Sequence, residues 1–213
     1  MNKNGKKMRF LITAGGTREY LDPVRYITNA SSGRMGYALA AAAMKAGHSV
    51  TLISAPTSLV PPTGAEVVSV VSAGDMFKAV KKHFKTCDCL IMAAAVSDYT
   101  PVEAAKVKRK KEKKVLTLKL KPTEDILTWA GQHKKQHVVV GFALEDRNLK
   151  HNAEKKLISK NADMIVANSP AAIGADSSRV LLKTPQWGWI EIAGNKAKTA
   201  RAIIRHITSL ILR

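Results

Sequence analysis

Residues 9–54 read RFLITAGGTREYLDPVRYITNASSGRMGYALAAAAMKAGHSVTLIS and decide the fold class of this chain. Within them, Arg9–Thr13 is a short apolar run that predicts a buried strand. Gly36–Lys45 is rich in alanine and predicts a helix, and Val50–Ser54 predicts the next strand. A strand, a helix and a strand in this order form the repeating unit of a parallel sheet.

The same alternation of strands and helices continues to the end of the chain. We expect further strands at Leu90–Ala95, Val138–Phe142 and Met164–Ala167, and a closing hairpin of Arg179–Leu182 and Trp189–Ile192. We expect further helices at Asp75–Lys85, Glu124–His133, Asn152–Asn161 and Lys196–Leu212. The pattern predicts an α/β fold, a three-layer Rossmann-like sandwich whose mostly parallel central sheet has helices on both faces. No repeat or linker divides residues 1–213, so we expect a single domain.

Two stretches interrupt this pattern. The connection between the first strand and its helix has roughly 20 residues, where about 2–6 are usual. Residues 99–123 are too charged for a core and too alternating for a plain loop, so Lys106–Lys121 is expected to form a protruding β arm, or flap. Ligands of α/β sheets bind at the C-terminal ends of the strands, where such extra length gathers.

The chain is strongly basic, with 35 Lys and Arg against 16 Asp and Glu and a formal net charge of +19. Residues 106–121 alone hold nine basic residues and one acidic residue, so the charge is clustered. Such clustering suggests nucleic acid, an anionic membrane or a small polyanionic ligand as partner. An apolar content of 46% excludes a disordered basic tail. The sequence has no apolar run of about 18 residues, so no membrane span is expected.

The cysteines and the N-terminal residues indicate the compartment. Cys87 and Cys89 are one residue apart, which suits a reduced compartment and a buried strand better than a disulfide or metal site. The first residues lack the features of a secretory signal, so a cytoplasmic location is expected. The histidines are scattered without metal-ligand spacing, so no metal-binding motif is predicted.

Small residues mark two candidate phosphate and nucleotide contacts. Ser31-Ser32-Gly33 precedes Gly36 at the start of a helix, which is the composition of a phosphate cradle, although an ordinary serine N-cap is the alternative. It is neither a dinucleotide fingerprint nor a P-loop. Ala93–Asp98 ends a strand in small residues and then an acid, which suits a base and a ribose; a tightly packed strand with a turn aspartate is the alternative.

Paired lysines are candidates for binding the phosphates themselves. Lys156 and Lys160 are spaced i, i+4 and therefore share one face of a helix, where they either grip a triphosphate or are simply solvated. Lys106 and Lys108 alternate in the expected arm, so they are predicted to point to the same side of it.

The motifs together resemble the phosphopantothenoylcysteine synthetase family over nearly the whole chain. They occur in the family's order and read TAGGTREYLDPVRYITNASSGRMGYALA, AAAVSDYTP, KVKRK, PTEDIL, VGFALE and KKLISKNADMIVANS. In many bacteria this domain is fused behind a flavin-dependent decarboxylase. The sequence shows no such domain, so neither decarboxylation nor a flavin is predicted.

The resemblance implies a ligase of coenzyme A biosynthesis that joins 4′-phosphopantothenate to L-cysteine. The pantothenate carboxylate would attack the α-phosphate of CTP, giving an acyl-cytidylate and pyrophosphate, and the amine of cysteine would then displace CMP. Mg²⁺ would accompany the triphosphate. The first motif looks like the bacterial branch that uses CTP, with ATP as the alternative. Members of the family are dimers whose flap reaches towards the other subunit's site, so a homodimer is expected.

The resemblance also assigns roles to residues. Asn29 resembles the asparagine that holds the acyl intermediate, Lys106 the flap lysine that acts at the α-phosphate, and Arg25 a substrate contact. The spacing from Asp98 to Lys106 is shorter than in the family, so Lys108 is the alternative catalytic lysine. The implied nucleotide-binding residues are Ser31, Ser32, Gly33, Ala93, Ala94, Asp98, Lys108, Asp125, Ile126, Phe142, Lys156 and Lys160.

Two other classes compete with the ligase. A nucleic-acid-binding α/β protein would explain the charge of +19, but an aromatic content of 5% gives few stacking platforms, and we expect no specific nucleic-acid partner. A steep fall of affinity with salt would reveal such binding. A reductase that binds NADP would fit the order of elements, but no glycine fingerprint follows the first strand.

Overall fold

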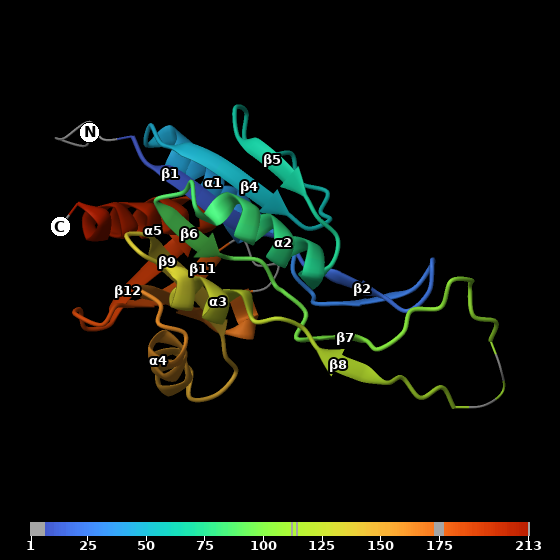
Figure 1. Ribbon diagram of the computed structural model, residues 1–213. Coiled ribbons are helices and arrows are strands. Elements are labelled where there is room, and N and C mark those ends of the chain that lie inside the picture. Colours follow the sequence, from blue (N-terminus) through green and yellow to red (C-terminus); the bar gives the residue numbers. More distant parts are fainter. Residues whose placement is uncertain (1–6, 112, 114, 173–176, 213) are drawn as a thin grey trace.

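The computed structural model describes residues 7–111, 113, 115–172 and 177–212, and a mixed sheet lies at its centre (Figure 1). Within these residues the sheet has eight strands in the order β12-β11-β10-β9-β6-β1-β4-β5. Neighbours from β10 to β5 are parallel, and β11 and β12 are added antiparallel. The strands are β1 (Arg9–Ala14), β4 (Ser49–Ser54), β5 (Glu66–Ser69), β6 (Cys89–Met92), β9 (Val138–Leu144), β10 (Met164–Asn168), β11 (Ser177–Lys183) and β12 (Ile190–Asn195).

Helices cover both faces of this sheet. Phe10 and Ile12 of β1 pack with α1 (Arg34–Lys45) and α5 (Lys196–Ile211), while Leu11 points to the opposite face. That opposite face is covered by α2 (Ala73–Phe84), α3 (Ile126–His133) and α4 (Leu149–Ser159). The predicted three-layer α/β sandwich is therefore confirmed. Among the described residues, no helix combines the length and the apolarity that a membrane crossing needs.

Several boundaries differ from the predicted ones, and one sheet strand was not predicted. Strand β5 is a short edge strand whose residues are mostly exposed, so it lacks the apolar run that marks a buried strand. Helix α3 begins later than predicted, because Asp125 is its N-cap and accepts a hydrogen bond from the Thr128 amide at 2.8 Å.

The arm corrects a second expectation. Only its base is a ribbon, in which β7 (Tyr99–Pro101) pairs antiparallel with β8 (Leu120–Pro122). The described residues between these strands contain no strand, so the prediction that Lys106 and Lys108 share one face of a β arm is wrong. The physical reason is that a lone two-stranded ribbon has no further layer on which to bury its apolar residues, and facing lysines repel each other. Figure 1 shows the arm projecting away from the body.

The long connection after β1 is a second projection. It folds into a hairpin of β2 (Arg18–Tyr20) and β3 (Tyr26–Thr28), strands too short to be recognised in the sequence. The hairpin is tied to the start of α2, because the Arg18 amide donates to Val71 O at 2.9 Å and Glu19 accepts from the Ala73 amide at 2.8 Å. Glu19 is buried, so this attachment is shielded from water.

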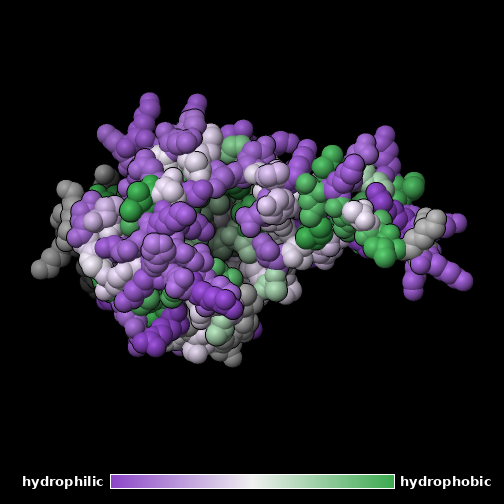
Figure 2. Space-filling model, turned by 90° about the horizontal axis from the view of Figure 1, so that it is seen from below, coloured by the Kyte–Doolittle hydropathy of each residue, from purple (hydrophilic) through white to green (hydrophobic). Residues whose placement is uncertain are grey.

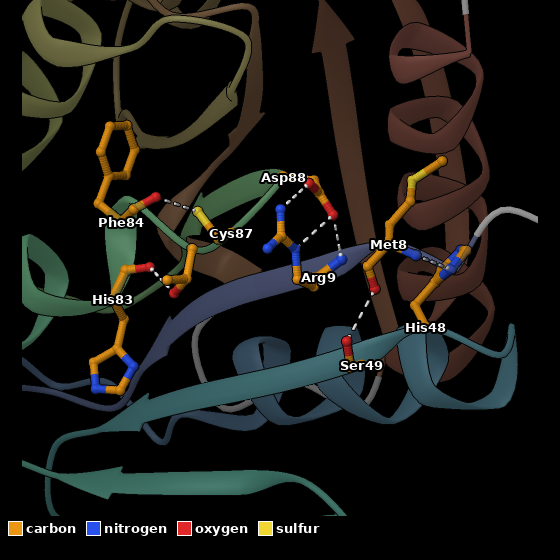
Figure 3. A network of polar contacts seen from close by, with 9 residues as sticks. Met8, Arg9, His48, Ser49, His83, Phe84, Cys87 and Asp88 are labelled. Carbon is orange, nitrogen blue, oxygen red and sulfur yellow. Dashed lines mark hydrogen bonds and ion pairs between the residues drawn. The ribbon is translucent and has the colours of Figure 1, made fainter.

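The opposite end of the sheet is closed by polar contacts (Figure 3). The Asp88 carboxylate accepts from the Arg9 amide at 2.8 Å and from the Arg9 Nη2 at 2.7 Å, which joins the starts of β1 and β6. Cys87 and Cys89 are buried and free, as expected. Burial is the main cause that raises the pKa of the Cys87 thiol to about 12, so this thiol stays protonated and unreactive at neutral pH.

A glycine of α3 gives a stability prediction. A methyl group at Gly131 would overlap the backbone carbonyl oxygen of Lys160, so Gly131→Ala should destabilise the fold by roughly 1–3 kcal/mol. The matched control is Gly74→Ala in α2, where only ordinary contacts are met and a gain of up to about 1 kcal/mol is expected. Thermal unfolding followed by circular dichroism measures both, and equal melting temperatures for the two variants would contradict the packing argument.

Candidate active site

A cavity of about 580 Å³ lies at the C-terminal ends of β6, β9 and β10, beside the start of α1. The chain leaves β1 towards β4 on one side, whereas β6 begins the half of the sheet on the other side. Loops on the two sides of such a reversal diverge, and α/β sheets bind their ligands in the resulting crevice. The position of the cavity thus follows from the strand order.

Asn29 follows β3 and lines this cavity. Its Nδ2 donates to the carbonyl oxygens of Ala95 at 3.3 Å and Val96 at 3.2 Å, in the loop after β6. The same two loops are joined by backbone bonds, because the Ala95 amide donates to Gly15 O at 2.8 Å and the Thr17 amide donates to Ala95 O at 3.2 Å. The carboxamide is therefore oriented by two carbonyl oxygens of the loop after β6, and that loop is itself bonded to the loop after β1.

Helix α1 begins at the cavity, and its N-cap residue provides no side-chain hydrogen bond to the first amide groups of the helix. Its N-cap is Gly33, at φ 75°, and not a serine, so the alternative of an ordinary serine cap is wrong. Ser31 Oγ instead accepts from the Gly33 amide at 3.4 Å, and Thr57 donates to the Ser32 carbonyl at 3.1 Å. A side chain at Gly33 would press on the backbone of Gly15 at 3.3 Å. Uncapped amides and the helix dipole favour a bound anion here.

Lys156 of α4 and Lys160, the C-cap of this helix, both line the cavity, on one side as their spacing predicted. Lys156 donates to Phe142 O at 2.8 Å, and Lys160 pairs with Asp125 at 2.8 Å. Both side chains line the cavity and are partly buried, so they are not simply solvated. Burial is the main cause that lowers the pKa of Lys156, while the carboxylates of nearby acids act in the opposite direction. Uptake of an anionic ligand would relieve this loss of solvation.

Asp125 gives a pH-dependent prediction. Burial works to raise its pKa, but hydrogen bonds from Lys160 and the Thr128 amide outweigh burial and lower the pKa. The stabilisation from the charged form is therefore present above the unfolded-state pKa, near 4, and is lost as pH falls through the lower folded-state value. Asp125→Asn keeps an N-cap, so it should lower the melting temperature at pH 7 and lose this effect near pH 2. A difference that grows on acidification would contradict the ion pair.

Most of the residues singled out from the sequence line this one cavity. They are Asn29, Ser31, Ser32, Gly33, Ala93, Ala94, Asp98, Asp125, Ile126, Phe142, Lys156 and Lys160. Sequence reasoning missed Arg34, Thr123, Leu144, Asn168 and Lys196, which line it too. Asn168 ends β10, so the end of a predicted parallel strand was a usable signal. Lys196 begins α5, which comes from the antiparallel end of the sheet and carried no such signal.

Three predicted residues do not line the cavity. Lys106 and Lys108 are exposed on the arm. Arg25 lies in the β2–β3 turn, where its Nη2 pairs with Asp22 at 2.7 Å and donates to the carbonyl oxygen of Arg109. In this structure Arg25 therefore contacts the arm and does not line the cavity, and its role as a substrate contact stays a prediction.

Comparison with known proteins gives the family. The chain matches the family described as DNA/pantothenate metabolism flavoprotein C-terminal domain over residues 5–211. The chain belongs to this family. The resemblance drawn from the motifs is thereby confirmed. A relative of this flavoprotein C-terminal domain, the coenzyme A biosynthesis bifunctional protein CoaBC of Bacillus subtilis, is 51% identical over 166 residues. That match covers 78% of this chain but 41% of the relative, so the chain spans less than half of that protein's length.

Solved structures share the fold of this flavoprotein C-terminal domain. The crystal structure of the C-terminal domain of a CoaBC protein has a TM-score of 0.84 and 39% identity, covering 96% of this chain and 95% of that one. A Cab2 variant in complex with phosphopantothenate-cysteine has a TM-score of 0.79, covering 96% of this chain and 86% of that one. At 19% identity this second likeness shows the fold alone.

Proposed function

We propose that this chain joins 4′-phosphopantothenate to L-cysteine through an acyl-cytidylate, with release of pyrophosphate and CMP, in coenzyme A biosynthesis. The observation that carries the proposal is the placement of Asn29. Its carboxamide is fixed at the rim of a cavity that is also lined by the N-terminus of α1, by Lys156 and by Lys160. The resemblance of the motifs and the name of the Bacillus subtilis relative support the same reaction.

The first half-reaction activates the carboxylate. A carboxylate oxygen of phosphopantothenate forms a bond to the α-phosphorus while the bond to the bridging oxygen breaks, and pyrophosphate leaves with that electron pair. Negative charge grows on the phosphate oxygens in this step. Lys156, Lys160 and the amides at the start of α1 line the cavity and would stabilise that charge. We propose that the arm supplies one further cation for this step, the side chain of Lys106 or of Lys108.

The second half-reaction forms the amide. The amine of cysteine attacks the acyl carbon, the bond to the phosphate oxygen breaks, CMP leaves, and the nitrogen loses a proton. Asn29 would bind the acyl group so that the carbonyl carbon faces the incoming amine. Because its Nδ2 is already engaged with Ala95 and Val96, its orientation would be set before the ligand arrives.

Mg²⁺ would enter with the triphosphate, whose charge it neutralises when bound. The carboxylates of Asp98 and Glu124 line the same cavity and are oxygen donors of the kind that this ion prefers. We propose that they hold the ion together with the phosphates and water. Although the family name contains the word flavoprotein, we propose that this chain uses no flavin.

The arm supports a further part of the proposal, a homodimer. Its exposed apolar residues gather on one projection, where Figure 2 shows them beside long hydrophilic side chains. They are Val107, Val115, Leu116, Leu118 and Leu120. Apolar groups gathered on a projection favour contact with another surface. Sedimentation of the purified chain measures its oligomeric state.

One assay tests the ligase and the nucleotide together. The purified chain is incubated with phosphopantothenate, L-cysteine and Mg²⁺, with CTP and ATP in parallel, and both pyrophosphate and product are measured. We expect equal amounts of pyrophosphate and phosphopantothenoylcysteine with CTP. Turnover with ATP alone would revise the nucleotide. A lack of turnover with both nucleotides would show that the ligase proposal is wrong.

A further inference from the structure

The arm is attached to the β2–β3 hairpin by hydrogen bonds from two of its backbone amides, one to a backbone carbonyl and one to a side-chain carboxylate. The Ala105 amide donates to Leu21 O at 2.9 Å, and the Arg109 amide donates to Asp22 Oδ2 at 3.2 Å. These bonds lie on either side of Lys106 and Lys108. The stretch that carries both candidate lysines is therefore held at its two ends by the turn of one hairpin.

Asp22 is the centre of this attachment. Its side chain is buried, and its Oδ1 accepts from the amides of Val24 and Arg25, each at 2.9 Å. Its Oδ2 accepts from Arg25 Nε at 2.9 Å as well as from the Arg109 amide. The Arg25 guanidinium in turn donates to the Arg109 carbonyl oxygen, so both backbone groups of Arg109 are engaged.

The charge of this carboxylate persists at physiological pH. Burial works to raise the pKa of Asp22, but the amides of Val24, Arg109 and Arg25 and the Arg25 side chain together lower it to about 2. Removal of this buried carboxylate would strongly destabilise the local structure, because each donor would lose its acceptor. The turn and the arm are therefore held by one ionised group.

The other end of the same hairpin leads to the cavity. The Thr28 hydroxyl at the end of β3 donates to Thr17 O at 2.7 Å, and the next residue is Asn29, fixed on the loop after β6. Glu19 of β2 accepts from the start of α2. The hairpin is thus braced against the body, with Asn29 at its foot and the arm at its turn. Figure 1 shows it projecting on the same side as the arm.

We propose that Asp22 is a positioning residue, which fixes arm residues 105–109 on the hairpin and so sets where Lys106 and Lys108 lie relative to Asn29. A lysine that acts in one half-reaction and an asparagine that acts in the other must contact the same bound ligand. A displacement of either side chain by about 1 Å is enough to slow catalysis strongly. The catalytic part of this inference rests on the proposed ligase function, whereas the anchoring part does not.

Anchoring is measured without any activity. Amide hydrogen exchange of the whole chain, read by mass spectrometry, reports the opening of residues 105–111. Asp22→Ala and Asp22→Asn should accelerate exchange there at least tenfold. The matched control is Asp88→Asn, which removes another carboxylate paired with an arginine, at the far end of the sheet, and should leave the arm unchanged.

A second pair of variants separates the arm from the fold of the hairpin. Arg109→Pro removes the amide that donates to Asp22, whereas Arg109→Ala keeps it. Arg109→Pro should accelerate exchange in residues 105–111 as Asp22→Ala does, and Arg109→Ala should not. Equal exchange in Arg109→Pro and Arg109→Ala, or no change in Asp22→Ala, would overturn the anchoring.

Catalysis is tested by a double-mutant cycle on pyrophosphate release. Asp22→Ala should lower kcat of the first half-reaction at least tenfold and change KM for CTP less than threefold, because the cavity itself is intact. In a Lys106→Ala or Lys108→Ala background, whichever lysine is catalytic, the same change should cost nothing further. Additive losses, or a rise in KM alone, would show that Asp22 does not act through the arm. An inactive wild type with accelerated arm exchange in Asp22→Ala would instead refute the ligase and leave the anchoring in place.

Discussion

Asn29→Ala should still release pyrophosphate from CTP and phosphopantothenate, yet form product on the order of 100-fold more slowly than the wild type. The first half-reaction depends on cations and helix amides that this substitution leaves in place. The second depends on an acyl group held in a fixed orientation, and the carboxamide is the group that the structure fixes on the Ala95 and Val96 carbonyls. An activated intermediate should therefore accumulate.

The measurement is a rapid quench followed by mass spectrometry of the nucleotide species. Asn152→Ala is the control, because Asn152 donates to Glu145 at 3.0 Å and does not line the cavity. The control should turn over like the wild type. Normal cysteine-dependent turnover in Asn29→Ala would show that the asparagine has no such role.

Lys106→Ala should reduce the first half-reaction by about 100- to 1,000-fold, because it removes a charge aimed at the α-phosphate in the transition state. Cysteine is omitted, and pyrophosphate release is followed with CTP and phosphopantothenate. Lys106 does not line the cavity in this structure, so the prediction requires the hairpin and the arm anchored on it to move together over a cavity, its own or a partner subunit's.

Two neighbours decide what such a loss means. If Lys108→Ala gives the large loss and Lys106→Ala does not, Lys108 is the catalytic lysine. Lys113→Ala, at an exposed position further along the arm, should change the rate less than threefold. An equal loss in all three variants would show that the total charge of the arm matters and no single lysine does.

The core of the fold could be predicted because its strands and helices follow from local sequence patterns. The apolar run Val138–Phe142 and the alanine-rich α1 can each be recognised from a few neighbouring residues. Their ends fixed the site as well, since parallel strands bring their C-terminal ends to one edge. Asp98 follows a predicted strand and was placed at this edge by that rule, whereas the role of Asn29 came from the family resemblance of its motif.

What the sequence could not predict depends on contacts between distant segments. The arm alternates like a strand, but strand formation needs a partner that its residues do not provide, so it stays irregular beyond β7 and β8. The contacts that Asp22 and Arg25 make with Arg109 join segments more than 80 residues apart. A motif match assigned Arg25 to a substrate, whereas its place at the hairpin turn became visible only in three dimensions.

The hydrogen bond from Lys156 to the Phe142 carbonyl has a consequence for affinity. An ammonium group has three N–H donors, so two remain for a phosphate when one is used by the protein. A free lysine side chain loses conformational entropy when a ligand immobilises it, at a cost of about 0.5–1.5 kcal/mol. Lys156 has already lost that freedom during folding. Binding of a nucleotide therefore does not incur the entropic cost of immobilising this side chain.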